Sequence, residues 1–565
     1  MSNLTAASAP VTALQYQVMW NRLISVVEEQ AQALIRTAFG TSTREAGDLS
    51  AGVFLPDGRM IAQAVTGTPG HVNSMAESVK HFLRAFPLEQ MRPDDVFLTN
   101  DPWKGTGHLY DMTMVTPVFR QEQAVGLFAS TLHVADIGGL GPGPDGQVIY
   151  HEGLFLPLLR FIDGGHINQV VLDIIRANVR EPEQVEGDLL ALVACNDVGA
   201  RFLNRMMDEF ALDSLVPVGE HILQHSEQAM RDAVRQWPQG SWSNELLVDG
   251  YDAPIRLRAT LHIRDGEIEV DFTGTDPYVP QGINVVKAYT DAYTSFGIRC
   301  LIGADIPNNA GSLGVIHVNA PEGSIVNAPY PAAVAARHII GQLLPDVVFG
   351  CLRQARPGAV PAEGSSSLWN IRLSGGHPIA GYSNERLVNE QRFTITSFST
   401  GGTGGRPTLD GLSTTSFPSG VRNISIEILE TMSPLVFWRK EYRPDSGGAG
   451  RQRGGLGQII EISHGQQAPM LLGAAWDRIV YPARGAEGGA DGAPGRVSLA
   501  SGALLKGKGR QAIPPGEHLV VETPGGGGLG DARERSAHAI AQDVRSGLVS
   551  AQAASRDYHY GDENQ

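Results

Sequence analysis

Glycine content constrains the fold of this chain more than any other feature of its sequence. Of 565 residues, 67 are glycine, about 12% where ~7% is typical. They concentrate in three segments, 401–405, 447–457 and 525–530. Hydrophobic residues make up 42% of the chain, so disorder is not expected. Runs of this kind predict a loop-rich fold with many tight turns, in which glycine supplies the positive φ.

The charge balance and the cysteines argue against several classes of protein. Lys and Arg number 44 against 60 Asp and Glu, and no dense basic stripe is present, which argues against nucleic-acid binding. The three cysteines are far apart and form no C-x-x-C pair, so neither a disulfide framework nor a thiolate zinc site is indicated. The N-terminus lacks the basic and apolar regions of a secretory signal, and no run reaches about 18 apolar residues. We therefore expect a cytoplasmic protein without a membrane span.

Apolar periodicity predicts the main elements. A helix over 14–39 is followed by Gly40 in the position of a C-cap glycine. Strands on either side of Pro56-Asp57-Gly58 form a predicted hairpin, and a helix is expected near 74–86. Further helices are expected at 167–213, 216–237 and 333–355, strands at 240–275 and 365–530, and a helical tail at 532–555.

These elements predict a mixed α/β (α+β) protein with several sub-domains and glycine-rich loops. The sequence has no clean repeat of about 20–50 residues, which argues against a solenoid or a propeller. We divide the chain into an N-terminal α/β region (1–240), a central α+β region (241–360) and a C-terminal β-rich region with a helical tail (361–565).

Two strand-like segments, 113–119 and 124–133, flank a short polar stretch. If they pair as a plain hairpin about that stretch, the numbers of paired residues sum to about 243–244. Position 111 then lies opposite 132 or 133. The hairpin therefore brings Asp111 and His133 together at the open end of the ladder, although they are 22 residues apart in the chain.

Two H-x-x-D pairs occur in this part of the N-terminal region, His108 with Asp111 and His133 with Asp136. Imidazole nitrogen and carboxylate oxygen suit Zn²⁺, Mn²⁺ or Fe²⁺, and the flanking glycines would let backbone pass close to a metal or substrate. A single such pair is often only a structural hydrogen-bonded pair, but two pairs aligned by one hairpin favour a metal site. A bound metal can lower the pKa of water to about 7 or polarise a carbonyl oxygen.

Motifs for other chemistries are missing from the sequence. It has no G-x-x-x-x-G-K-[ST] phosphate loop, no dinucleotide fingerprint after a strand and no G-x-S-x-G nucleophile motif. Cys195 lies in an apolar helical pattern and is predicted to be a core residue. Three further carboxylates, those of Asp48, Asp101 and Asp136, are candidates for orienting the histidines or shuttling protons.

Many stretches match one known family in order along the chain. They are TREAGDLSAGVF (43–54), HVNSM (71–75), NDPWKGTGHLYDMTMVTPVF (100–119), LHVADIGGLGPG (132–143), EGL (152–154), DFTG (271–274), PEGSIVNAPYPAAV (321–334), DSGGAGRQRGGLG (445–457) and TPGGGGLGD (523–531). On these stretches the chain resembles the hydantoinase B/oxoprolinase family along nearly its whole length.

The resemblance implies the metal-containing subunit of a two-component, ATP-dependent cyclic amide hydrolase. A hydantoinase A-like partner would bind ATP and Mg²⁺, in an α2β2 heterotetramer, and would phosphorylate the amide oxygen of a lactam, hydantoin or 5-oxoproline ring. Water activated at the metal of this chain would then attack the phosphorylated amide. The metal is expected to be zinc, with manganese or iron as alternatives. Its implied ligands are Glu45, His108, Asp111 and His133, and Asp48 lies close enough in sequence to replace Glu45.

Two other functions stay open beside the hydrolase. The same resemblance extends to ATP-dependent ketone carboxylases, which usually have longer chains and often a small third subunit. A non-catalytic scaffold for the ATP-binding subunit is the other alternative, and bound Zn, Mn or Fe would argue against it. Trp103 and Lys104 depart from the family's usual pattern, which leaves the cyclic amide itself unidentified.

Overall fold

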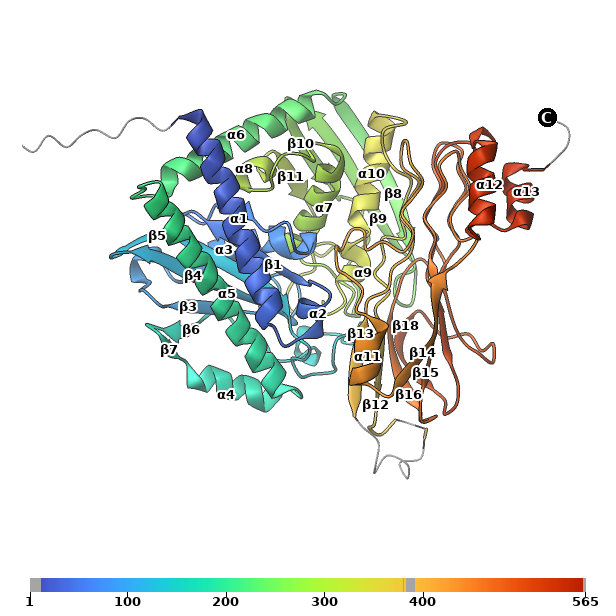
Figure 1. The fold of residues 1–565 in the computed structure, drawn as a ribbon, viewed down its shortest axis with the longest axis horizontal. Coiled ribbons are helices and arrows are strands. Elements are labelled where there is room, and N and C mark those ends of the chain that lie inside the picture. The colour runs from blue at the N-terminus through green and yellow to red at the C-terminus, as the bar shows by residue number, and fades with distance from the viewer. Residues whose placement is uncertain (1–11, 380, 383–391, 562–565) are drawn as a thin grey trace, which may run out of the picture.

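The structure is a computed structural model that describes residues 12–379, 381–382 and 392–561. Figure 1 shows the N-terminal sheet with its helices at one end of the molecule and the C-terminal strands at the other. The central region lies between them. Helices α12 (Ala537–Arg545) and α13 (Ala551–Tyr558) form the outer C-terminal edge.

A seven-stranded antiparallel sheet organises the N-terminal region, in the order β2-β1-β5-β4-β3-β6-β7. Helices α1 and α5 pack on one face and α3 on the other. Phe128 therefore joins the apolar cluster beneath α1 and α5, whereas its neighbours Leu127 and Ala129 join the cluster beneath α3. The strands are β1 (Leu49–Phe54), β2 (Met60–Gln63), β3 (Val96–Thr99), β4 (Asp111–Arg120), β5 (Gln123–His133), β6 (Leu159–Asp163) and β7 (His166–Ile167). The helices are α1 (Ala13–Thr37), α2 (Thr41–Arg44), α3 (Pro69–Ala85), α4 (Gln169–Asn178), α5 (Pro182–Glu209) and α6 (Val216–Arg235).

The central region pairs a four-stranded sheet with helices, in the order β11-β10-β9-β8. Burial alternates along β9, so one of its faces packs inward, where α10 covers β8 and β9. Helix α7 packs on α3 of the first region, which joins the two regions in one apolar core. The elements are β8 (Gly240–Val248), β9 (Ile255–Arg264), β10 (Glu267–Asp271), β11 (Ile316–Asn319), α7 (Lys287–Leu301), α8 (Ala310–Leu313), α9 (His338–Gly341) and α10 (Leu344–Ala355).

Two four-stranded antiparallel sheets form the C-terminal region, in the orders β13-β12-β16-β18 and β14-β15-β19-β17. They enclose a separate apolar core in which the rings of Trp369 and Trp476 stack at 4.9 Å. The elements are β12 (Ile371–Gly375), β13 (Phe393–Ser397), α11 (Ile426–Met432), β14 (Leu435–Tyr442), β15 (Gln458–His464), β16 (Met470–Ala475), β17 (Arg496–Leu499), β18 (Lys508–Ile513) and β19 (Leu519–Glu522).

The three glycine segments pack on one another, and we call them together the glycine layer (401–405, 447–457 and 525–530). Backbone hydrogen bonds join them, from Gly448 N to Gly526 O at 2.9 Å and from Gly405 N to Gly527 O at 2.8 Å. A Cβ placed on Gly454 would overlap the carbonyl oxygen of Gly526. The prediction of positive-φ turns is wrong here, because among the glycines of these segments, all of which are described, only Gly530 has positive φ. Glycine is required instead because the backbones approach too closely for any side chain.

Several sequence-based predictions are confirmed. The 14–39 helix is α1, the two strands beside Pro56-Asp57-Gly58 pair as β1 and β2, and the helices, strands and helical tail further along occur close to their expected positions. Cys195 is fully buried in the core. The mixed α/β fold class is confirmed, whereas the three region boundaries stay a prediction.

Three local predictions are wrong. Gly40 has a φ of −68° and caps the start of α2; a Cβ there would lie 2.9 Å from Asp188 Oδ2, so space rather than a C-cap explains the glycine. Helix α3 begins at Pro69 rather than 74, because proline is favoured in the first helical turn. The 333–355 helix is two helices, with Pro345 in the first turn of α10.

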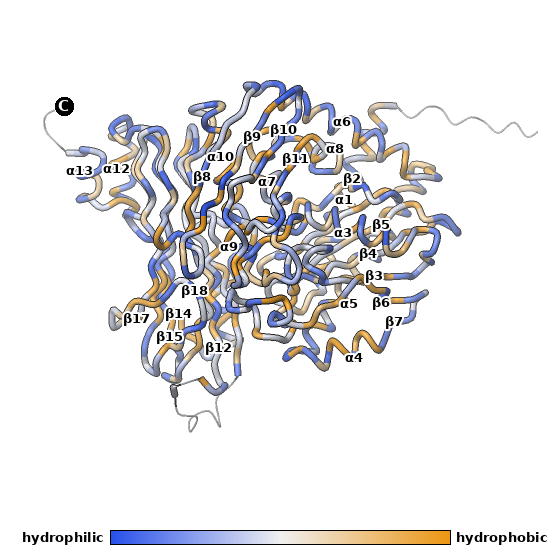
Figure 2. Tube along the Cα trace, turned by 180° about the vertical axis from the view of Figure 1, so that it is seen from behind, coloured by the Kyte–Doolittle hydropathy of each residue, from blue (hydrophilic) through white to orange (hydrophobic). Residues whose placement is uncertain are grey.

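Short hydrophobic and hydrophilic segments are interspersed along the chain. Figure 2 shows apolar segments broken at short intervals by polar ones rather than gathered into one long band. In the part of the chain that the structure describes, no helix is both long and apolar enough to cross a membrane.

Candidate metal centre

The β4–β5 hairpin places the predicted ligands. Asp111 is the first residue of β4 and pairs with His133, the last residue of β5, and the paired numbers sum to 244 along most of the ladder. One bulge near the turn lowers the sum to 243. His108 precedes β4 by three residues, and its ring meets the same end of the hairpin. One ligand atom from each of His108, Asp111 and His133 lies within 4.8 Å of the others.

Asp111 is the centre of the cluster. Its Oδ1 lies 2.7 Å from His108 Nε2 and 3.3 Å from His133 Nδ1. Its Oδ2 accepts from Thr106 Oγ1 and Arg337 Nη2, both at 2.6 Å, and lies 3.1 Å from His71 Nε2. The carboxylate is fully buried, so these contacts replace the water that it would otherwise need.

Electrostatics fix the charge state of this carboxylate. Burial by itself would raise the pKa of Asp111, but His108, His71 and Arg337 hold it well below its usual range. The pKa of His71 is raised in turn, because Asp111 and Asp48 outweigh the effect of its burial. Asp111 is therefore an anion at neutral pH.

The contacts of the His108 ring indicate whether these residues suit a metal. Its Nδ1 lies 3.0 Å from the carbonyl oxygen of Ala335, and its Nε2 lies 2.7 Å from Asp111 Oδ1. Burial, with the positive charge of Arg337, lowers the pKa of His108 to about 3, so the ring is neutral and carries one N–H. One ring nitrogen must then direct a lone pair at an oxygen. A cation shared by Nε2 and the carboxylate resolves this conflict, so the donor set fits a divalent metal.

A glycine next to the cluster makes room for its arginine. Gly107 has a φ of 104°, and a Cβ there would lie 2.6 Å from Arg337 Cδ. Arg337 also places its guanidinium carbon 4.2 Å from the centre of the Tyr289 ring. Gly107 therefore makes room for a protein side chain, and the predicted approach of glycine backbone to a metal or substrate stays a prediction.

The other predicted residues occupy different places. Asp48 lines the same cavity as the histidines, with its Oδ1 3.5 Å from His71 Nδ1. Glu45 does not line the cavity, and its carboxylate accepts from Arg44 Nε at 2.9 Å. Asp101 accepts from the backbone of Trp103 at 3.0 Å and pairs with Lys104 at 3.1 Å.

Asp136 forms an ion pair with Arg180 and accepts from the Gly138 N–H at 3.3 Å. Neither Asp101 nor Asp136 lines the cavity of the histidines. The structure therefore brings together four of the predicted residues. The remaining three, Glu45, Asp101 and Asp136, form ion pairs with Arg44, Lys104 and Arg180. The four are Asp48, His108, Asp111 and His133.

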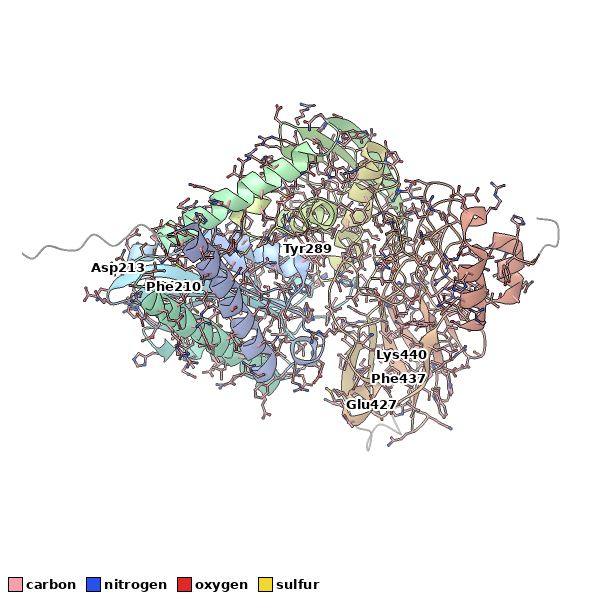
Figure 3. The ribbon with its side chains drawn as sticks, turned by 45° about the horizontal axis from the view of Figure 1, so that its top comes forward. Phe210, Asp213, Tyr289, Glu427, Phe437 and Lys440 are labelled. Carbon is pink, nitrogen blue, oxygen red and sulfur yellow. The ribbon has the colours of Figure 1, made fainter. Side chains whose placement is uncertain are left out.

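A cavity of about 90 Å³ adjoins the cluster. All three regions of the chain line it, and Figure 3 shows one lining residue, Tyr289, in the middle of the molecule between the N-terminal and C-terminal regions. Sequence reasoning gave no role to several residues of its wall. They are His71, Tyr289, Tyr293, Arg337, His338 and Arg372.

Only His71 among these had a usable signal, because it lies in the HVNSM stretch that carries the family resemblance. Arg337 and Arg372 lie in stretches without any motif, far in sequence from the histidines. They reach the cavity through tertiary packing alone.

The structure is a mixed α/β protein with a buried histidine–carboxylate cluster that could hold a metal ion. The chain belongs to the hydantoinase B/oxoprolinase family, which matches it over residues 12–532. It is 31% identical to an uncharacterized protein of Methanocaldococcus jannaschii, over 94% of this chain and 93% of the relative. It is 27% identical to a protein of a Pseudomonas strain that is named as one subunit of a putative D-/L-hydantoinase, over 99% and 96% of the two chains.

Solved structures agree with this assignment. The ATP-dependent caprolactamase of Pseudomonas jessenii matches with a TM-score of 0.85 and 26% identity, over 97% of this chain and 96% of that one. A nucleotide-free acetone carboxylase matches with a TM-score of 0.82 at 18% identity, over 96% and 79% of the chains, which shows a shared fold.

Proposed function

We propose that this chain is the metal-binding subunit of a two-component, ATP-dependent enzyme that hydrolyses cyclic amides. Family membership supports this class of enzyme, and relatives named as hydantoinase, 5-oxoprolinase and caprolactamase support a cyclic amide substrate. The observation that carries the proposal is the buried cluster in which both ring nitrogens of His108 face oxygen atoms.

His108, Asp111 and His133 would hold the metal, with zinc the first expectation and manganese or iron as alternatives. For the further carboxylate we favour Asp48 over Glu45, because Asp48 faces the cavity and Arg44 holds Glu45. When bound, the metal would supply Lewis acidity towards an oxygen of the substrate.

The surrounding residues would orient the cluster and carry protons. Arg337 and Thr106 hold Asp111 Oδ2, which leaves Oδ1 directed at the two histidines. The Ala335 carbonyl fixes the ring of His108 by accepting from Nδ1. If Glu45 is the further ligand instead, Asp48, which lies beside His71, would be free to accept a proton from an attacking water.

The partner would activate the amide. Phosphorylation of the amide oxygen makes phosphate a leaving group, and addition of one water to the activated carbon, with protonation of the ring nitrogen, breaks the C–N bond. A second water then releases phosphate from the acyl phosphate. This chain has no phosphate-loop motif, so ATP and Mg²⁺ would bind to the partner.

Two relatives are named as single subunits of larger enzymes, one of a putative hydantoinase and one of a caprolactamase, which supports a hydantoinase A-like partner. An α2β2 assembly in the cytoplasm, without nucleic acid or membrane, completes the proposal.

The test is a panel of cyclic amides, hydantoin, 5-oxoproline and caprolactam, with the co-purified complex. We expect ADP release and ring opening on one of them, together with a bound divalent metal in the complex by elemental analysis. His108→Ala should abolish both, and full activity in that variant would contradict the metal site. Incorporation of labelled bicarbonate would show a carboxylase instead, and an active metal-free complex would show a scaffold.

A further inference from the structure

The wall of the cavity carries an arginine whose positive charge is not balanced. Arg372 lies on β12 and faces the cavity from the C-terminal region. Its Nη1 donates to the backbone oxygen of Pro142, and its Nε has no hydrogen-bond partner among the described residues. Within the described chain no carboxylate lies within ion-pairing distance of its guanidinium, whereas Arg180 and Arg510 nearby each have one. The side chain of Arg372 is half-buried, and its Nε is out of reach of solvent. A guanidinium with such an unpaired N–H and no carboxylate is costly to hold in a fold, which makes this one a candidate for binding an anion.

The neighbouring arginines differ from Arg372 in this respect. Arg180 pairs with Asp136, and Arg510 lies 3.8 Å from Asp145. Both approach Gly141, in the loop whose next residue accepts from Arg372. Each of these two has a carboxylate partner, and only the charge of Arg372 is left for a ligand within this cluster.

Local packing provides space for the long side chain. Arg372 pairs with Gly473 of β16, and a Cβ on that glycine would lie 3.2 Å from Arg372 Cδ. Gly473 also lines the cavity, so the stem of the arginine runs along its wall. Burial, with Arg510 and Arg180 nearby, lowers the pKa of Arg372 to about 10, so it is still a cation at neutral pH.

Other polar atoms of the same wall are also unpaired. Among the described residues, His338 Nε2 and Asn370 Oδ1 are buried without a hydrogen-bond partner, and both residues line the cavity. Unpaired buried polar atoms are rare and destabilise a fold, so a group of them in one cavity points to a polar ligand.

We propose that Arg372 binds an oxyanion, a carboxylate or a phosphoryl group of the molecule that occupies the cavity. His338 supplies a further ring nitrogen beside it. The inference rests on the proposed function for the identity of that molecule: the oxyanion is either a carboxylate carried by the cyclic amide or the phosphoryl group of its activated form. In both cases Arg372 is a binding residue, contributed by the C-terminal region to a centre whose cluster of His108, Asp111 and His133 comes from the N-terminal region.

Direct binding to the full chain tests this without partner or ATP. The probes are inorganic phosphate, 5-oxoproline, which is a lactam with a carboxylate, and 2-pyrrolidinone, the same ring without one. We expect calorimetry to show binding of phosphate or of 5-oxoproline that Arg372→Met weakens about 10- to 100-fold, as the loss of a charge-assisted hydrogen bond does. The variant should leave 2-pyrrolidinone unaffected.

The arms of the experiment separate the sources of the anion. Dependence of 5-oxoproline binding on Arg372 assigns the substrate carboxylate, and dependence of phosphate binding alone assigns the phosphoryl group. Arg510→Met is the matched control, because that arginine already has a carboxylate, and it should change either affinity by less than about threefold. Equal weakening by both substitutions, or no binding of either anion, would overturn the assignment.

Stability provides a readout that a structural role would not give. Because Arg372 has no carboxylate, Arg372→Met should raise the denaturation midpoint of the ligand-free chain or leave it unchanged. A lower midpoint together with unchanged anion affinity would show that the arginine only supports the fold. His108→Ala should retain anion binding, so loss of ring-opening activity and failure of this proposal are distinguishable.

Discussion

The cluster of His108, Asp111 and His133 and the glycine layer are both densely packed, but different atoms of the chain make their contacts. In the cluster, side chains and their charges make the contacts: Asp111 alone meets three neighbours through Oδ2. In the glycine layer the backbone makes them, as between Gly448 and Gly526. The difference teaches where each region is vulnerable. The cluster depends on which groups are present, whereas the layer depends on groups being absent.

The largest effect should come from adding one methyl group to the glycine layer. Gly454→Ala would drive a Cβ into the carbonyl oxygen of Gly526, and both are backbone, so neither can move aside cheaply. We expect a loss of about 3 kcal/mol or more in the free energy of unfolding, measured by denaturant titration.

Gly358→Ala is the control for this change. Gly358 has a φ of 75° and nothing within 4 Å of a Cβ, so only backbone strain of about 1–2 kcal/mol is expected. A larger loss at Gly358 than at Gly454 would show that backbone conformation, not close approach, explains the layer.

Removing one charge from the cluster should cost both activity and stability. Asp111→Asn leaves the buried guanidinium of Arg337 without its carboxylate, which costs about 3 kcal/mol in the free energy of unfolding. We expect turnover by the complex to fall about 1000-fold or more, and bound metal to be lost. Asp276→Asn, at a half-exposed pair with Arg256, should change stability by less than about 1 kcal/mol and leave turnover intact. Retention of metal in the Asp111 variant would show that this carboxylate is not needed for metal binding.

Asp188 combines a buried charge with close packing against glycine. Its carboxylate accepts hydrogen bonds from the N–H groups of Phe39 and Gly40, and Gly40 has no room for a Cβ beside it. Burial raises the pKa of Asp188 from 3.8 to about 6. The folded state therefore holds this proton more tightly than the unfolded state. Its contribution to stability is greatest below about pH 4 and is lost as the pH rises to about 6, by about 3 kcal/mol.

Asp188→Asn removes this titration. The free energy of unfolding of the native chain should fall relative to that of the variant between pH 4 and pH 6.5, as measured by urea denaturation at each pH. Parallel profiles for the two proteins would mean that the pKa of Asp188 is the same in the folded and the unfolded state.

The smallest effect is expected at Glu45. Because Arg44 holds its carboxylate outside the cavity, Glu45→Gln should change kcat/KM of the complex by less than about twofold. Asp48→Asn, which alters a cavity-lining carboxylate beside His71, should lower it about 10- to 100-fold and weaken metal binding. The reverse order would make Glu45 the further ligand, as the family resemblance implies.

The spacing of residues along the sequence was enough to predict that Asp111 and His133 lie side by side in one hairpin. The sequence spacing of β4 and β5 determines the register, and the register brings Asp111 opposite His133. This works because a two-stranded ladder obeys a period of two and a constant sum of paired numbers. The H-x-x-D spacing places His108 at the same end of the hairpin, since three residues cannot carry it far.

The same local reasoning failed for contacts made between regions. It gave no signal for Arg337 or Arg372, which reach the cavity from the central and C-terminal regions. It explained the glycine segments as turns. The glycines are the only sequence signal of three backbone segments packing closely, and the sequence does not show which segments pack together. The role predicted for Asp101 and Asp136 stays a prediction, and the structure pairs these carboxylates with Lys104 and Arg180 outside the cavity of the histidines.

The sequence by itself thus determined the fold class, the hairpin and three candidate metal ligands, because each follows from periodicity or from short spacing. Only the tertiary structure decided the charge network of Asp111, the close packing of the glycine layer and the arginine that faces the cavity. Each of the three includes contacts between residues more than 70 positions apart: Arg337 with Asp111, Gly448 with Gly526, and Arg372 with Pro142. Such contacts are set by the packing of whole sheets against one another rather than by any local preference.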